Sequence, residues 1–185
     1  RCRLRISLGQ FGKLTRKFLA TVPFSLTGAQ KRVISEISED LQSPQAMNRL
    51  VQGDVGSGKT LVAMSAMVTV CENGYQTALM APTEILAKQH YTTLSAQCEA
   101  IGLRLVLLTG ALTGAARAEV LEEIKSGKAD IIIGTHALIQ EDVDFKKLGL
   151  VVIDEQHRFG VMQRATLRNK GIRADVLVMT ATPIP

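Results

Sequence analysis

Tryptophan is missing from this sequence, and aromatic residues make up only 4% of its 185 positions. Long hydrophobic runs are missing too, because the longest, such as 131–133 and 148–153, have only the length of a β-strand. Basic residues near the start are not followed by an unbroken apolar segment, so there is no secretory signal pattern. The sequence therefore argues against a membrane protein and predicts one globular domain of ordinary size.

Cysteine pairs and metal-ligand spacings are also lacking. The three cysteines are odd in number and contain no C-x-x-C pair, and the three histidines show no regular spacing. This pattern is typical of buried thiols in a reducing compartment rather than of disulfides or zinc. We therefore expect a cytoplasmic protein with no metal site built from protein side chains alone.

Acidic residues are absent from the first 33 positions. Eight of the 22 basic residues lie there, which leaves 14 basic against 17 acidic residues in the rest of the chain. A basic leader on a nearly neutral domain fits contact with a polyanion, but a solvated chain end fits equally well. We expect residues 1–22 to be a basic leader, or a linker from a preceding domain.

Short apolar segments alternate with segments of helical periodicity along the chain. Most of these segments lack polar alternation, which is typical of strands covered on both faces. They are 49–51, 78–80, 105–108, 131–133, 151–153 and 176–179. Between them lies helical spacing, and residues 61–70 are apolar nearly all round. This order predicts an α/β fold, a doubly wound, mainly parallel sheet with helices on both faces and ligands at the carboxyl ends of the strands.

A glycine-rich segment at 53–60, with the sequence Gly-Asp-Val-Gly-Ser-Gly-Lys-Thr, matches the P-loop pattern. It lies between a predicted strand and a helix that we expect to start near Lys59. The glycines let successive N–H groups point at phosphate oxygens, and the helix N-terminus adds positive charge. We expect Lys59 to reach the β- and γ-phosphates of ATP and Thr60 to ligate Mg²⁺. The full set of phosphate-binding candidates is Gly53, Gly56, Ser57, Gly58, Lys59 and Thr60.

Two adjacent carboxylates, Asp154 and Glu155, directly follow the predicted strand at 148–153. Adjacent strand residues point to opposite faces, so the two side chains need not do the same job. We assign Asp154 to Mg²⁺ and Glu155 to orienting and deprotonating the attacking water. A pair that only caps the next helix is the alternative. With the P-loop, the pair predicts an ATP hydrolase whose catalytic residues are Lys59, Asp154 and Glu155.

The ordered motifs of this chain resemble those of superfamily 2 helicases, and they cover nearly the whole chain from about residue 23. They are Gln30, 53–60, 81–84, 109–110, 134–136, 154–157 and 180–182. Three phrases, at 26–30, 154–161 and 180–185, resemble the bacterial branched-DNA helicases within this superfamily. The transcription-repair coupling translocases are the next most similar, but they usually carry Glu where this chain has Gln156. The resemblance implies a RecA-like P-loop NTPase fold, with residues 23–185 as the first motor domain of a larger protein.

The resemblance also implies roles for individual residues. Gln30 would read the adenine edge with Phe24 packing on the base, although residues 27–30 equally fit a helix capping box. Three loops would hold the DNA phosphate backbone, a contact that fixes register without reading sequence. Helix capping is again the alternative, with Thr83 as an N-cap. The DNA-binding candidates are Pro82, Thr83, Glu84, Thr109, Gly110, Thr135 and His136.

Four residues are expected to couple the nucleotide site to the DNA track: Gln156, His157, Thr180 and Thr182. Hydrogen bonding within the neighbouring loop is the alternative for Gln156 and His157. Phosphoryl transfer also needs a cation against the γ-phosphate. The resemblance implies that a second RecA-like domain of the same parent chain supplies it as an arginine. We therefore expect residues 1–185 alone to bind nucleotide, hydrolyse it poorly and not unwind DNA.

The function implied for the parent protein is that of an ATP-dependent DNA helicase that remodels forks and junctions in recombination and repair. It would use ATP and Mg²⁺, bind branched or duplex DNA without sequence preference and work in the bacterial cytoplasm at the nucleoid. One alternative is a duplex-DNA translocase of transcription-coupled repair. A second alternative is a nucleotide-gated DNA-binding module that does no mechanical work. A third alternative is a small-molecule P-loop kinase.

Overall fold

Six parallel strands form one sheet in the computed structural model, which describes residues 12–53, 58–155, 165–166 and 173–181. The strand order is β1-β6-β5-β2-β4-β3, and every neighbouring pair is parallel. Each of the six apolar segments forms a strand, as predicted. The strands are β1 (Asn48–Gln52), β2 (Gln76–Met80), β3 (Leu105–Leu108), β4 (Ile131–Gly134), β5 (Leu148–Glu155) and β6 (Asp175–Thr180).

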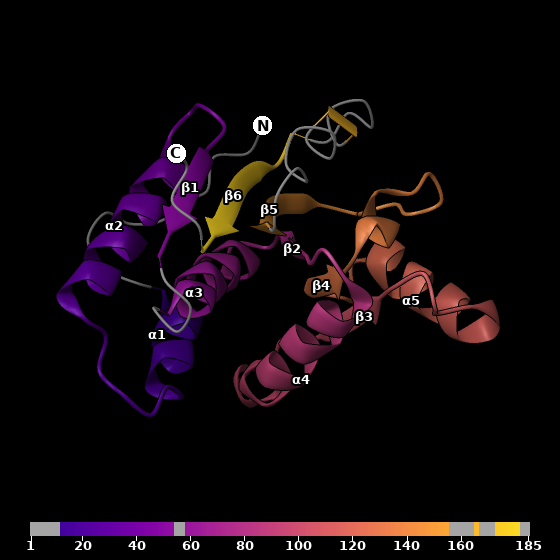
Figure 1. Ribbon diagram of the computed structural model, residues 1–185, viewed down its shortest axis with the longest axis horizontal. Coiled ribbons are helices and arrows are strands. Elements are labelled where there is room, and N and C mark those ends of the chain that lie inside the picture. The colour runs from indigo at the N-terminus through magenta and orange to yellow at the C-terminus, as the bar shows by residue number, and fades with distance from the viewer. Residues whose placement is uncertain (1–11, 54–57, 156–164, 167–172, 182–185) are drawn as a thin grey trace.

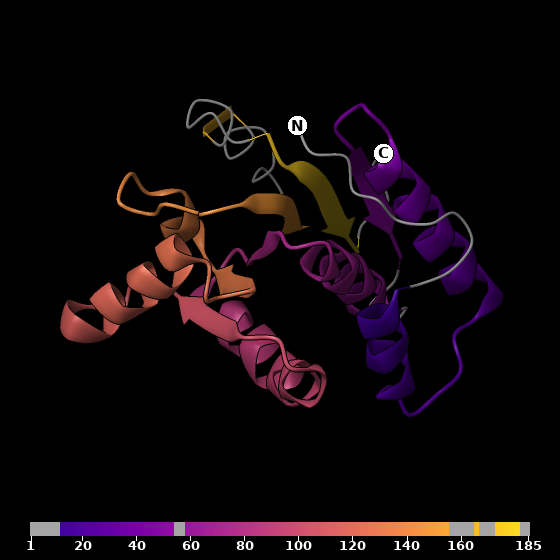
Figure 2. The same cartoon turned by 180° about the vertical axis from the view of Figure 1, so that it is seen from behind.

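Helices cover both faces of this sheet, which confirms the predicted doubly wound α/β fold. The helices are α1 (Lys13–Ala20), α2 (Gly28–Gln42), α3 (Lys59–Glu72), α4 (Glu84–Ile101) and α5 (Gly114–Ser126), with a 3₁₀ turn η1 (His136–Ile139). Strand residues alternate between the faces: Leu79 packs in a cluster with α1 to α4, and Met80 in a cluster with α5 and η1. Helices α1 and α2 pack on α3, which lies against β2, β5 and β6, while α4 lies beside β3 and β4, and α5 beside β3 (Figures 1 and 2).

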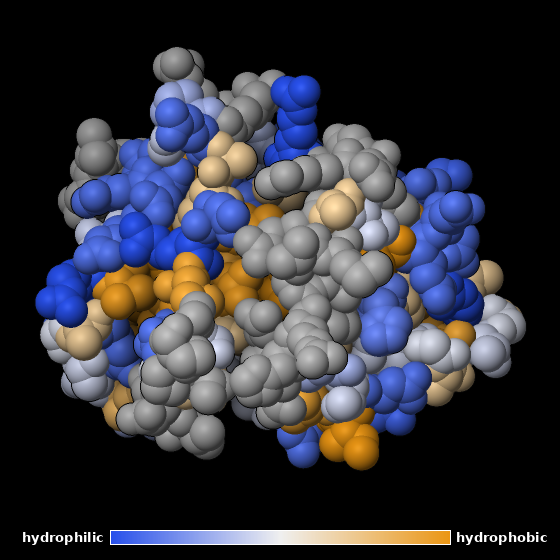
Figure 3. Space-filling view, turned by 45° about the horizontal axis from the view of Figure 1, so that its top comes forward, coloured by the Kyte–Doolittle hydropathy of each residue, from blue (hydrophilic) through white to orange (hydrophobic). Residues whose placement is uncertain are grey.

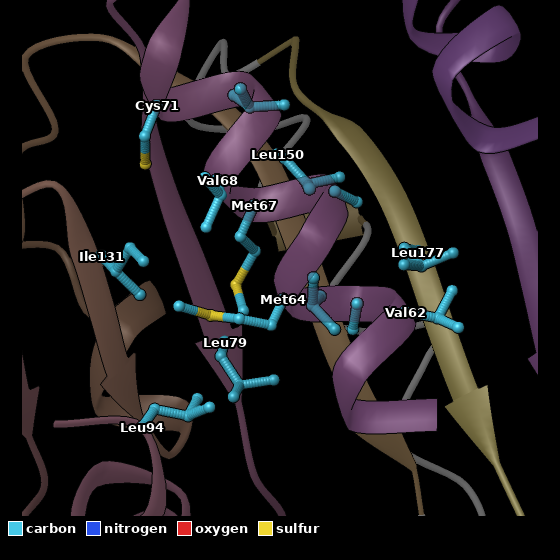
Figure 4. Packing of buried hydrophobic residues seen from close by; sticks show 14 of the residues in the cluster. Val62, Met64, Met67, Val68, Cys71, Leu79, Leu94, Ile131, Leu150 and Leu177 are labelled. Atoms are coloured by element: carbon cyan, nitrogen blue, oxygen red, sulfur yellow. The ribbon is translucent and has the colours of Figure 1, made fainter. Parts of the chain in front are cut away.

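Helix α3, which follows the P-loop, is the centre of the larger cluster. All residues from Val62 to Cys71 are buried, as its apolar sequence predicts. Figure 4 shows Met64 and Met67 directed toward Leu79 of the sheet, with Val62 near Leu177. Because a close-packed interior resists displacement, this burial fixes where the first turn of α3 meets the carboxyl edge of the sheet.

Helix α1 lies within the expected leader and packs against the folded domain. Phe18 is 1% exposed, and the Thr15 hydroxyl lies 3.0 Å from that of Thr69 in α3. The Leu14 amide donates a hydrogen bond to the Glu72 carboxylate over 3.0 Å. From residue 13 onward the segment therefore packs on the domain, whereas residues 1–11 lie outside the described part of the chain.

Few large hydrophobic side chains are exposed in the described residues. Figure 3 shows one face on which hydrophilic residues dominate, with a band of hydrophobic surface beside residues drawn in grey. The large hydrophobic side chains that stay exposed in the described residues are Phe24, Leu50 and Ile85. No helix in these residues is both long and apolar enough to cross a bilayer.

Cys71 and Cys98 are buried free thiols, as the sequence predicts, and Cys2 lies outside the described residues. Burial raises the pKa of Cys71 to about 12 and that of Cys98 to about 11. Both side chains therefore remain neutral thiols at physiological pH and act as packing groups rather than nucleophiles.

Candidate functional site

The P-loop and the acidic pair lie at the same edge of the sheet, on two strands separated only by β6. Thr180, the last residue of β6, pairs with Gln52 on one side and with Glu155 on the other. The Gly53 amide then donates to the Thr180 carbonyl over 3.2 Å. Strands two positions apart are separated by about 10 Å, roughly the span of a bound triphosphate and its ion. The arrangement brings together two segments that lie about ninety positions apart in the sequence.

The described part of the P-loop has the geometry that anion binding requires. Gly58 is the N-cap of α3 and has a left-handed backbone with φ 83°, a conformation that suits glycine. The Lys59 ammonium reaches back across the loop and donates to the Gly53 carbonyl over 2.5 Å. Thr60 lies in the first turn of α3 and is half-buried. The positive N-terminal end of α3 and the Lys59 ammonium therefore lie beside the same loop, where both would attract an anion. Gly56 and Ser57 fall outside the described residues.

Gln30 lies against the end of this loop. A Cβ at position 58 would collide with the Gln30 amide nitrogen, so a side chain there would displace the Gln30 amide. The same side chain closes a capping box at the start of α2, where Thr27 N–H donates to Gln30 Oε1 over 2.9 Å. The capping alternative is therefore present in the structure. Adenine reading by Gln30 stays a prediction, as does base packing by Phe24, whose side chain is 59% exposed.

Asp154 is held by a residue that sequence reasoning did not select. The His90 Nε2 and Asp154 Oδ2 atoms lie 2.7 Å apart, and the side chains are 15% and 27% exposed. His90 belongs to α4, so the contact joins positions 64 residues apart. No spacing rule predicts such a pair. The backbone of Glu155 ends β5, but its side chain, together with Gln156 and His157, lies outside the described residues.

The donor groups at this edge fit Mg²⁺ bound together with a nucleotide. They are oxygens, the Thr60 hydroxyl and the Asp154 carboxylate, which are the ligand type that this hard cation prefers. In the described residues no group of three or more His, Cys, Asp and Glu side chains could hold an ion by itself. Mg²⁺ is commonly bound by one or two carboxylates plus substrate phosphates, and this donor set matches that pattern.

The predicted DNA loops occupy the other half of the same edge, after β2, β4 and β3. Thr83 caps α4 by accepting from Leu86 N–H over 3.2 Å, and the Glu84 carboxylate accepts from Ala111 N–H over 3.0 Å. The Ala81 amide donates to the Gly134 carbonyl over 2.8 Å. The three loops are therefore tied to one another, which places the candidate contacts in one row.

Exposure differs among these candidate contacts. Thr83, Gly110 and His136 are exposed, whereas Thr109 and Thr135 are buried. Thr135 caps the 3₁₀ turn η1, and so the capping alternative is present for it as for Thr83. Exposed amides and hydroxyls in a row can hold a phosphate backbone without reading bases, which is the chemistry expected of these loops.

Comparisons with known proteins agree with this arrangement. The sequence model of the DEAD/DEAH box helicase family matches residues 27–185. The ATP-dependent DNA helicase RecG of Synechocystis sp. is 56% identical over 174 residues, which are 94% of this chain and 21% of the relative. RecG of Bacillus subtilis is 56% identical over 169 residues, 91% of this chain and 25% of the relative. The chain thus spans about a fifth to a quarter of the length of these curated relatives.

Solved structures give the same result. The structure of RecG bound to a three-way DNA junction has a TM-score of 0.80 and 51% sequence identity, over 94% of this chain and 23% of that one. The Mycobacterium smegmatis helicase Lhr, bound to single-stranded DNA and AMP-PNP, has a TM-score of 0.74 and covers all of this chain and 26% of its own. Its sequence identity is only 22%, so this second likeness shows the fold alone.

Proposed function

This chain belongs to the DEAD/DEAH box helicase family, and from that premise we propose that it is the ATP-binding motor domain of an ATP-dependent DNA helicase. One observation carries the proposal. The strands that lead into the P-loop and the acidic pair flank β6 and end at one edge, where Gly53 is bonded to Thr180. A hydrolase needs phosphate-binding and metal-binding groups at such a shared position.

In the proposed mechanism, the phosphates of ATP lie in the P-loop, against the amides at the start of α3. The Lys59 ammonium moves from the Gly53 carbonyl to the β- and γ-phosphates. Thr60 and Asp154 would hold Mg²⁺, which, when bound, would supply positive charge against the phosphate oxygens. Glu155 orients the attacking water and accepts its proton.

We infer that DNA is held along the other half of the edge. The loops that contain Thr83, Gly110 and His136 would contact phosphates from exposed backbone and hydroxyl groups. Such contacts let a motor step along any sequence. Thr180 would couple this track to the nucleotide, together with Thr182, Gln156 and His157, which lie outside the described residues. Because the relatives are RecG proteins, one of them bound to a three-way junction, the proposed substrate is branched DNA.

The parent protein is proposed to be larger than this chain, which covers 21% of the Synechocystis RecG. A second RecA-like domain would supply an arginine against the γ-phosphate, a group that can contribute roughly 10³ to 10⁵ in rate. Residues 1–22, which include α1, would be a basic leader or a linker from a preceding domain. The protein would work in the bacterial cytoplasm, in association with the nucleoid.

Steady-state ATP hydrolysis by the whole protein tests this proposal. Three-way-junction DNA should stimulate turnover, and residues 1–185 alone should show little. Lys59→Ala should weaken ATP binding by about 1.5–3 kcal/mol, the scale of hydrogen bonds to a charged group. Lys125→Ala, which removes an exposed ammonium on α5, is the matched control and should bind normally. ATP turnover that does not increase with DNA would contradict the proposal, and so would equal ATP affinity in Lys59→Ala and Lys125→Ala.

A further inference from the structure

We propose that His90 is a positioning residue, which holds the metal-binding carboxylate of Asp154 in place and ties that position to the DNA loop at the start of α4. The inference rests on the proposed function, since it assigns Asp154 to Mg²⁺ and the 82–84 loop to DNA. It adds a residue that neither the P-loop nor the acidic pair contains.

The contact has the geometry of a strong, oriented hydrogen bond. His90 Nε2 lies 2.7 Å from Asp154 Oδ2, and both side chains are mostly shielded from water. An ionised carboxylate can only accept, so the ring N–H of His90 donates. The bond engages Oδ2 and restricts the rotation of the carboxylate, which would leave Oδ1 to bind the ion. Partners of this kind around a metal ligand typically contribute 10- to 100-fold to metal affinity or activity.

Helix α4 connects this bond to the proposed DNA track. Its first residue, Glu84, holds the Ala111 amide over 3.0 Å, and Thr83 caps the helix. His90 lies six positions after Glu84, about 9 Å along the helix axis. Over that distance a helix moves as one body, so a displacement of the loop shifts the imidazole by a similar amount.

The sheet adds a second connection between Asp154 and the loop at the start of α4. Strand β2, which leads into α4, pairs directly with β5, which ends in the acidic pair; Met80 is opposite Ile153. Asp154 therefore lies at the boundary between the nucleotide half and the DNA half of the edge. His90 reaches across this boundary from the DNA side. Through it, a change at the DNA loop would shift the carboxylate that binds the ion.

Binding measurements on the whole protein separate positioning from general stability. Affinity for a non-hydrolysable ATP analogue should fall 10- to 100-fold in His90→Ala with Mg²⁺ present, and should be unchanged in EDTA. His90→Gln should recover the affinity, because its amide nitrogen takes the place of Nε2. His90→Asn should not, because its nitrogen takes the place of Nδ1. Gln89→Ala, an exposed neighbour on α4, is the control and should match the wild type.

Hydrolysis with and without three-way-junction DNA tests the connection. His90→Ala should lower the DNA-stimulated kcat more than the unstimulated one, with little change in the KM for DNA. If the wild type is itself not stimulated, the proposed function fails. If the wild type is stimulated and His90→Ala keeps the same ratio, only this inference fails. Should His90→Ala not fold, as judged by thermal unfolding, the Gln and Asn variants decide: equal Mg²⁺-dependent affinity in both overturns the role of His90.

Discussion

The backbone N–H of Gly53 donates a hydrogen bond to the carbonyl oxygen of Thr180, 3.2 Å away. Gly53 is the first residue of the P-loop, and Thr180 is the last residue of β6, directly opposite Glu155 of β5. One strand end therefore contacts both halves of the proposed hydrolytic site. Thr180 is one of the four residues expected to couple that site to DNA, and its place between the two segments suits such a role.

Gly58→Ala should weaken ATP binding through its contact with Gln30. Gly58 and Gly74 have nearly equal backbone angles, φ 83° and 85°, so alanine at either costs about 1–2 kcal/mol of stability. Only at position 58 would the new methyl group collide with the Gln30 amide, since nothing lies within 4 Å at position 74. Calorimetric titration should show lost affinity in Gly58→Ala and normal affinity in Gly74→Ala. Equal affinities would show that the Gln30 contact has no bearing on the nucleotide.

Comparison of Gln30→Ala with Thr27→Ala separates adenine reading from helix capping. Both changes break the capping box, and loss of the Thr27 cap should cost about 1 kcal/mol of stability. Only Gln30→Ala should reduce the preference for ATP over GTP, by about tenfold if it removes one hydrogen bond to the base. The measurement is competition binding with both nucleotides. If both variants retain the preference, Gln30 is a capping residue alone.

Glu84→Ala should impair the response to DNA without affecting nucleotide binding. The Glu84 carboxylate holds the Ala111 amide and so fixes the loop that contains Gly110. Glu84→Gln keeps a carbonyl acceptor at this position and should behave nearly as the wild type. DNA-stimulated hydrolysis by the whole protein is the readout. A normal response in Glu84→Ala would show that this loop does not hold the DNA backbone.

The Arg104–Glu123 pair should make stability depend on acidity. Two hydrogen bonds of 2.7 and 2.8 Å from Arg104 lower the pKa of the Glu123 carboxyl, against the opposing effect of burial. A carboxyl with a lowered pKa stabilises the fold above its unfolded pKa of about 4.3, and this stabilisation is lost as pH falls through the folded value. Because Arg104 is 53% exposed, solvent screening limits the contribution to about 1 kcal/mol.

Glu123→Gln should therefore be less stable than the wild type at pH 7, with a difference that shrinks as the pH falls below about 4. The exposed neighbour Glu122 offers the control, since Glu122→Gln should match the wild type throughout. Denaturant unfolding between pH 3 and pH 7 gives the comparison. A difference that stays constant over this range would mean that the charge of Glu123 is not what stabilises the fold.

Local patterns predicted most of the fold. Strands β2 and β4, buried along their whole length, read as unbroken apolar segments, whereas the edge strand β1 is largely exposed. The all-round apolar sequence of α3 predicted its burial. The P-loop was equally clear, because its glycines allow local backbone conformations, such as the left-handed one of Gly58, that other residues rarely adopt. The strand order could not be predicted in the same way, because it depends on contacts between strands that are far apart in the sequence.

Contacts between distant segments could not be predicted from the sequence. The burial of Phe18 depends on its partners in the folded domain, so a basic leader did not reveal that α1 packs against α3. The His90–Asp154 pair joins residues 64 positions apart, and a single histidine carries no periodic signal. For Thr83 and Gln30 the sequence left two roles open, because the residue types that cap helices also bind phosphates and bases.

A crystal structure of the chain with a non-hydrolysable ATP analogue and Mn²⁺ in place of Mg²⁺ tests the central claim most directly. Anomalous scattering locates the ion independently of the nucleotide. We expect a triphosphate in the loop from Gly53 to Thr60, with the ion between the Thr60 hydroxyl and the Asp154 carboxylate. An ion remote from Asp154, or a triphosphate bound outside the P-loop, would contradict it.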